Sequence, residues 1–346
     1  MDKVARLPAE RRRELFSETA ASMGMLAGLI EKDFWVCWIL KRLFSIPAFK
    51  SHLLFKGGTT LSKIFGVIRR FSEDIDLAVD WEMLGFVDEK SPLGDLSTTK
   101  RNALLDEMVE ACRGYICTDF LETLRERVAE ELPNFDSWQL VIDHDDRDVI
   151  NFMYPTTTEK VEYVPPAVRL ELGTHAEFIP NDRYSIRPYA ADPFSNIFED
   201  PVCTVQAIKV ERTFWEKATI LHQEHHRTTD RGAPTRLSRH YYDVFMMAGH
   251  HEILQRALSS SELLARVVEH KIRFYPRAWA RYDLAVPTSL QLLPSLDWID
   301  FLRRDYESMQ VMLFGEIPSF DDILAGLRDL EKTIRKMPQA NAPSRD

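Results

Sequence analysis

The chain has 346 residues, a formal net charge of −10 and 45% hydrophobic residues, enough for a large core and for two domains. No apolar run approaches the roughly 18 residues of a membrane span, and no apolar stretch of a signal peptide follows the start of the chain. These features argue against a membrane protein and favour a cytoplasmic one, in which the four cysteines are reduced.

Helix and strand patterns alternate in the first part of the chain, and helix patterns alone follow in the second. Helical spacing of apolar residues covers 8–45, about 59–65 and 99–132. Strand patterns cover 52–56, 74–80, 138–142, 149–154, 167–174 and 184–189. From Val205 onward, helices are predicted over 207–222, 238–250, 259–274 and 319–336.

A linker with two prolines, 192–201, separates the two parts. The predicted fold class is therefore α+β. A mixed sheet flanked by helices is expected over residues 1–200. A helical C-terminal domain, expected to complete the active site, follows over 201–346.

Asp74 and Asp76 stand one residue apart on a predicted strand, so their side chains project from the same face while Ile75 faces the core. Two carboxylates this close repel each other unless a cation lies between them. The preceding Gly57-Gly58 turn lets backbone N–H groups approach a phosphate closely, and Thr59 is a candidate N-cap of the next helix. The pattern predicts a site for a divalent metal and a triphosphate.

Glu171 is the predicted third metal ligand. It lies on the alternating strand 167–174, with Arg169 on the same face and two leucines on the other. Each pattern has a structural alternative: a Gly-Gly turn is common, an Asp-x-Asp pair is often a solvated strand face, and Glu171 alone reads as an exposed residue. Their order along the chain favours the metal site.

Lys217 and Asp243 are the candidate functional residues of the second part. A lysine on an apolar helix needs an anionic partner or an exit to solvent, and an exposed ammonium is the structural alternative for Lys217. Asp243 follows Tyr241 and Tyr242, which suit a helical core. If buried, Asp243 needs a donor, for which Arg239 at i−4 is a candidate.

The second part also carries histidines and a basic region. His222 and His226 have the spacing of a zinc-binding helix, but Gln223 stands where that pattern has Glu, which disfavours zinc. Residues 205–281 hold 13 basic and 8 acidic residues. The arginines of 227–239 can bind RNA phosphates, or they belong to a solvated surface loop. The arginines of 266–281 are interleaved with aromatic residues and can bind and stack RNA, or those aromatic residues belong to the core.

Four separated motifs resemble those of the AbiEii/AbiGii nucleotidyltransferase toxins. The first two are Gly57-Gly58-Thr59-x-Leu61-x-Lys63 and Arg70-Phe71-Ser72-Glu73-Asp74-Ile75-Asp76-Leu77. The third and fourth are Arg212-x-x-x-Glu216-Lys217-Ala218 and Ser238-Arg239-His240-Tyr241-Tyr242-Asp243. A leading helix at Glu31-Lys32-Asp33 is similar too, so the resemblance spans residues 28–250. In the fourth motif, His-Tyr-Tyr precedes Asp243, a departure from the commoner form.

The resemblance implies a DNA polymerase β-like nucleotidyltransferase core that uses a nucleoside triphosphate (NTP) with Mg²⁺, or Mn²⁺ in its place. It implies a toxin of a type IV toxin–antitoxin or phage-defence system, countered by an AbiEi-like antitoxin or its gene. The expected acceptor is the 3′ end of an RNA, and the expected RNA is tRNA. Transfer to a protein hydroxyl and a non-catalytic NTP-binding module are the alternatives.

The resemblance also implies residue roles. Asp74 and Asp76 hold metal, Lys217 contacts phosphates, and Asp243 is the fourth-motif acid, a base or an orienting group. The expected substrate-binding residues are Gly57, Gly58, Thr59, Lys63, Ser72, Arg212 and Arg239.

Overall fold

The fold is known from a computed structural model, which describes residues 1–72, 74–159, 161, 165–232 and 235–337. The chain forms two compact units. The sheet unit consists of Met1–Phe65 and Phe71–Ile208, and the helical unit of Gly66–Arg70 and Lys209–Asp346. The sequence placed the division after residue 200, whereas the contacts place it after Ile208 and give five earlier residues, 66–70, to the helical unit.

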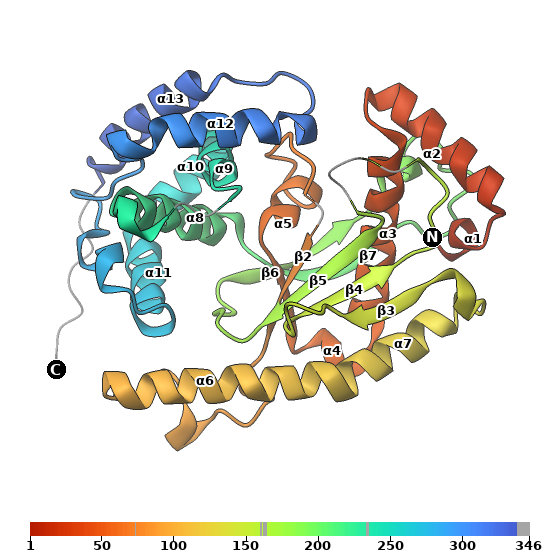
Figure 1. The fold of residues 1–346 in the computed structure, drawn as a ribbon, viewed down its shortest axis with the longest axis horizontal. Coiled ribbons are helices and arrows are strands. Elements are labelled where there is room, and N and C mark those ends of the chain that lie inside the picture. Colours follow the sequence, from red (N-terminus) through yellow and green to blue (C-terminus); the bar gives the residue numbers. More distant parts are fainter. Residues whose placement is uncertain (73, 160, 162–164, 233–234, 338–346) are drawn as a thin grey trace. The chain divides into compact units, whose positions relative to one another are not determined.

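One mixed sheet forms the centre of the sheet unit (Figure 1). Its strand order is β3-β4-β5-β2-β1-β7-β6. The strands are β1 (Leu53–Lys56), β2 (Asp74–Val79), β3 (Gln139–Ile142), β4 (Val149–Met153), β5 (Ala167–Gly173), β6 (Asn181–Ile186) and β7 (Cys203–Ile208). β2 lies between β1, with which it is antiparallel, and β5, with which it is parallel. The two predicted carboxylate strands are therefore neighbours.

The strand β7 corrects the expectation of helix from Val205 onward. Residues 203–208 pair with β1 and β6, and the helix begins only at Val210. Cys203, Val205 and Ala207 are buried, whereas the residues between them are exposed or half-buried. This alternation has the period of a strand. The pairing explains why the sheet unit extends past the predicted linker.

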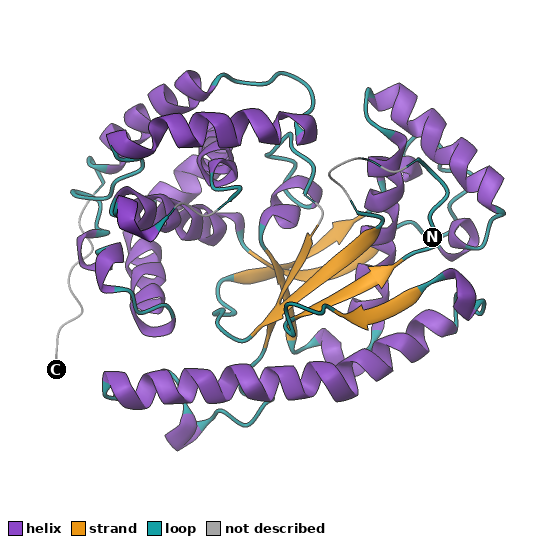
Figure 2. Ribbon diagram, in the orientation of Figure 1, coloured by secondary structure: helices purple, strands orange, loops and turns teal. Residues whose placement is uncertain are grey.

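Helices flank the sheet (Figure 2). They are α1 (Asp2–Ala5), α2 (Ala9–Met23), α3 (Ala27–Ser45), α4 (Pro47–Lys50), α5 (Gly58–Lys63), α6 (Thr98–Tyr115) and α7 (Leu121–Ala129). The single helix predicted over 8–45 is divided at Gly24, whose left-handed φ of 64° ends α2. The helix predicted over 99–132 is α6 and α7, joined by a π-helical turn at Ile116–Phe120.

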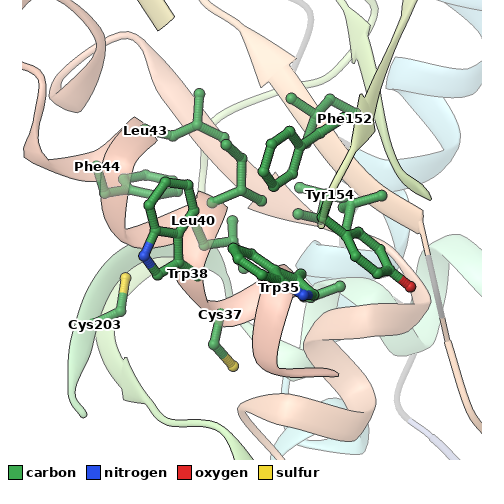
Figure 3. Packing of buried hydrophobic residues seen from close by; sticks show 14 of the residues in the cluster. Trp35, Cys37, Trp38, Leu40, Leu43, Phe44, Phe152, Tyr154 and Cys203 are labelled. Carbon is green, nitrogen blue, oxygen red and sulfur yellow. The ribbon is translucent and has the colours of Figure 1, made fainter. Parts of the chain in front are cut away.

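The core of the sheet unit lies between α3 and the sheet. Trp35 stacks on Tyr154 with ring centroids 5.6 Å apart, and Trp38 stacks on Phe152 at 5.9 Å (Figure 3). Both indoles are fully buried. Burying aromatic rings of this size removes some 150–250 Å² each from water, so α3 is fixed firmly against β4. The cysteines are free, and Cys37, Cys112 and Cys203 are buried.

The helical unit contains α8 (Val210–His225), α9 (Ser238–Gly249), α10 (His251–Leu258), α11 (Ser261–Phe274), α12 (Ile299–Met309) and α13 (Phe320–Ile334). Trp215, Tyr241 and Tyr242 are buried in its core, so the structural interpretation of these tyrosines is confirmed. A sheet flanked by helices, followed by a helical part, confirms the predicted α+β class. In the part of the chain that is described, no helix has both the length and the apolar character of a membrane span.

Candidate functional site

The acidic face of the sheet is formed by Asp74 and Asp76 of β2 and Glu171 of β5. The intervening Ile75 and Leu77 are fully buried, whereas both aspartates are half-buried. Asp76 is the register partner of Glu171, and Asp74 that of Arg169. The strand period and the parallel pairing therefore bring the three predicted carboxylates to one face, as the sequence pattern indicated.

Arg169 lies among these carboxylates. Its guanidinium is 3.8 Å from Asp74, 3.6 Å from Glu171 and 3.3 Å from Asp143. Asp143 also accepts a hydrogen bond from Asn151 at 2.8 Å, which lowers the pKa of this carboxyl. A protein cation thus offsets part of the negative charge of the acidic face. Nowhere in the described residues do three His, Cys, Asp or Glu side chains converge as a ready-made metal site.

Gly57 brings the backbone of the Gly-Gly turn against Asp76. Its φ is 81° and its ψ is −161°, a conformation that side-chain-bearing residues rarely adopt. A Cβ atom at this position would lie 1.8 Å from Oδ2 of Asp76. Only glycine therefore allows the start of α5, at Gly58, to lie beside this carboxylate. The turn and the acidic face form one constellation.

Thr59 ties this turn to β2. The residue is buried, and its hydroxyl donates to the backbone carbonyl of Asp74 and lies 3.0 Å from Oγ of Ser72. The expectation that Thr59 caps α5 is wrong, because the N-cap is Gly57 and no side chain makes the capping bond. Thr59 and Ser72 instead link α5 to the strand of the aspartates. Glu73 of the same motif lies outside the described residues.

Lys63 is placed in the interior rather than on the acidic face. Its ammonium is 2.7 Å from Asp33 of α3 and 3.7 Å from the ring centre of Tyr189, and its side chain is 5% exposed. Burial alone would lower the pKa of Lys63, but the Asp33 carboxylate raises it above its ordinary value. Lys63 therefore anchors α5 to α3, a role that the sequence pattern did not reveal.

A buried charge cluster surrounds Asp243 in the helical unit. Arg70 holds the fully buried carboxylate of Asp243 in two hydrogen bonds of 2.7 and 2.8 Å. The ammonium of Lys217 lies 2.8 Å from the same carboxylate. Burial would raise the pKa of Asp243, but these two cations outweigh it and hold the pKa well below its ordinary value. Asp243 is therefore ionised at neutral pH.

This cluster differs from the sequence expectation in its donors. Arg239 was the candidate partner of Asp243, but the structure gives that place to Arg70 and Lys217. Arg70 stands directly before Phe71-Ser72 in the second motif, and this position was the signal that could have identified it. Lys217 is buried, so its anionic partner rather than an exposed ammonium explains it. Burial lowers the pKa of Lys217, against the opposing charge of Asp243.

The other predicted residues of the helical unit interact with groups inside that unit. Arg212 is fully buried, and its Nε donates to Glu216 at 2.9 Å. Arg239 is half-buried beside the cluster, where its charge contributes to lowering the pKa of Lys217. His222 contacts the carbonyl of Arg281 at 2.9 Å and accepts a hydrogen bond from a backbone N–H. These ring contacts give that histidine a structural role.

Comparison with known proteins identifies a family, and solved structures with a similar fold include that of a toxin. The family model described as "Nucleotidyl transferase AbiEii toxin, Type IV TA system" matches residues 38–326. The structure is similar to that of MenT4, a nucleotidyltransferase toxin from Mycobacterium tuberculosis H37Rv, with a TM-score of 0.47 and 15% sequence identity. The match covers 94% of this chain and 90% of that one. No curated protein matches the chain.

Proposed function

The chain belongs to the AbiEii family of nucleotidyltransferase toxins of type IV toxin–antitoxin systems, and we propose that it transfers a nucleotide from an NTP to the 3′ end of an RNA, with tRNA as the acceptor and Mg²⁺ as the metal. The observation that carries this proposal is the close approach of Gly57 to Asp76 on the acidic face. Phosphate-binding backbone and metal-binding carboxylate are then adjacent, as nucleotidyl transfer requires.

The acidic face fits a divalent metal through its oxygen donors. Asp74 and Asp76 would hold the ion, and Glu171 would be the third ligand. A bound Mg²⁺, or Mn²⁺ in its place, would neutralise charge on the triphosphate and activate the attacking hydroxyl. The guanidinium of Arg169 places positive charge among these carboxylates. Arg169 would then move aside or contact the phosphates when the ion binds.

The phosphates would be bound by backbone and by cations. The N–H groups of Gly57 and Gly58 belong to a turn that is held in place by Thr59 and Lys63. In the helical unit, the two positive charges of Arg70 and Lys217 surround the single negative charge of Asp243. A bound anion would neutralise the remaining positive charge. We assign Lys217 to the phosphates and Asp243 to orienting that lysine.

In the proposed reaction, the oxygen of an RNA 3′-hydroxyl attacks the α-phosphorus of the NTP. The bond from the α-phosphorus to the bridging oxygen breaks, pyrophosphate leaves, and the hydroxyl proton passes to water. The family also implies an antitoxin that opposes this activity. The AbiEi-like character of that antitoxin, and a role in phage defence, belong to the proposal.

The decisive experiment compares Asp76→Ala with Asp80→Ala. Asp80 follows the same strand but pairs with His52 at 3.1 Å, so it is a matched control carboxylate. Each α-labelled NTP is incubated with total tRNA, with total cell extract and with or without EDTA. We expect label in RNase-sensitive material with wild type and Asp80→Ala, and none with Asp76→Ala or EDTA.

Other outcomes separate the alternatives. Protease-sensitive label would move the acceptor to a protein hydroxyl. Absence of metal-dependent NTP binding in calorimetry would indicate a non-catalytic module. Growth arrest by Asp76→Ala would contradict the assignment of the acidic face.

A further inference from the structure

A basic patch in the helical unit surrounds one tryptophan. We define it as Arg227, Arg231, Arg277 and Trp279. The three guanidinium carbons lie 4.7, 5.4 and 6.0 Å, respectively, from the ring centre of Trp279. Arg231 and Arg277 are exposed. Three positive charges around one indole repel each other, and the ring quadrupole offsets only part of that cost.

The arginines of the basic patch differ in how their donors are used. Arg227 donates to the carboxylate of Glu224 and to the carbonyl of Gly232. Arg231 and Arg277 make no ion pair with any carboxylate of the described residues, although Asp230 adds one negative charge beside Arg231. Packing against an indole uses the face of a guanidinium and leaves its in-plane N–H groups available. Those groups match the oxygens of a phosphate.

A second indole extends this surface. Nε1 of the half-buried Trp298 donates to the carbonyl of Arg227 at 3.1 Å, which places it beside the basic patch. Guanidinium groups alternating with aromatic rings are typical of surfaces that follow a nucleic-acid backbone and stack its bases. The chain as a whole carries −10, so it repels RNA except where positive charge is concentrated.

We propose that the basic patch binds the backbone phosphates of the RNA acceptor, with Arg231 and Arg277 as the phosphate ligands and Arg227 and Trp279 holding them in position. The inference rests on the proposed RNA acceptor. It adds a docking surface whose residues have no part in the proposed reaction, and it predicts RNA binding that needs neither NTP nor metal.

The test measures binding of the full chain to labelled total tRNA, without NTP or metal, at several salt concentrations. The variant is Arg231→Gln/Arg277→Gln. The control is Arg304→Gln/Arg328→Gln, which removes two exposed charges of the same unit, and in the described part of the chain neither guanidinium lies over an aromatic ring. The logarithm of the binding constant falls linearly with the logarithm of the salt concentration, and the size of this salt slope drops by about 0.7–0.9 for each lost phosphate contact. Two lost contacts therefore reduce it by about 1.5. When the salt concentration is raised from about 50 to about 200 mM, the affinity for tRNA therefore falls by a factor that is about eight times smaller in the variant than in wild type.

The control should keep the wild-type slope, and calorimetry should show unchanged metal-dependent NTP binding in both double variants. Equal slopes in the variant and wild type would overturn the inference. So would loss of antitoxin binding with unchanged RNA binding, because the surface would then recognise a protein. A failed nucleotide transfer with RNA binding that still depends on these arginines would overturn the proposed function but keep the docking surface.

Discussion

Replacing Gly57 by alanine tests the close contact between the Gly-Gly turn and Asp76. The backbone conformation at Gly57 costs a residue with a Cβ atom roughly 1–3 kcal/mol. The new Cβ would also lie 1.8 Å from Oδ2 of Asp76. Relieving such an overlap costs a further ~1–3 kcal/mol. We expect Gly57→Ala to lower the free energy of unfolding by about 4 kcal/mol and to abolish nucleotide transfer.

Gly24→Ala is the matched control. Gly24 also has a positive φ, 64°, but no atom lies within 4 Å of its added Cβ, so only about 1–2 kcal/mol is expected. Urea unfolding followed by tryptophan fluorescence measures both variants, because Trp35 and Trp38 report on the sheet unit. Adding Asp76→Ala to Gly57→Ala should restore the part due to the clash. If Gly57→Ala and Asp76→Ala change the free energy of unfolding by strictly additive amounts, the contact between the two residues is refuted.

Three further predictions concern buried or clustered charges. Lys63→Met should destabilise the protein by about 3–5 kcal/mol, because Asp33 is left buried without its cation, and Lys63→Met/Asp33→Leu should recover most of this loss in urea unfolding. Because the folded-state pKa of Asp243 is depressed, its ionisation stabilises the fold above its unfolded pKa of about 3.9, and this stability is lost as pH falls towards the folded pKa. Thermal unfolding from pH 6 to pH 3 should therefore show a shallower acid loss in Asp243→Asn than in wild type, and parallel curves would contradict the charge cluster. Arg169→Gln should tighten Mn²⁺ binding several-fold in an electron paramagnetic resonance titration, since it removes a cation from among the carboxylates of the acidic face, and weaker binding would show that Arg169 supports the site.

The sequence predicted those features that depend on local period. Alternation alone placed Asp74, Asp76 and Glu171 on one face, because a strand has only two faces and one of them is buried. The strand β7 was missed because its six residues run directly into an apolar helix, and only pairing with β1 and β6 decides between the two periods.

Long-range charge pairing was not predictable in the same way. Lys63 and Asp33 stand 30 residues apart, and Arg70 and Asp243 are separated by 173. No periodicity links such positions, so the sequence offered only local partners such as Arg239. The fold, rather than the spacing, decides which buried charges meet.

The passage of residues 66–70 into the helical unit has a consequence for synthesis of the toxin. The chain leaves the sheet unit after Phe65 and re-enters it at Phe71, immediately before the strand of the aspartates. Hence no single cut yields either unit intact. On the ribosome, the carboxylate that holds Arg70 is made 173 residues after it, so every product that ends before Asp243 lacks this link. A cell that produces this toxin therefore meets its finished form only after most of the chain has been translated.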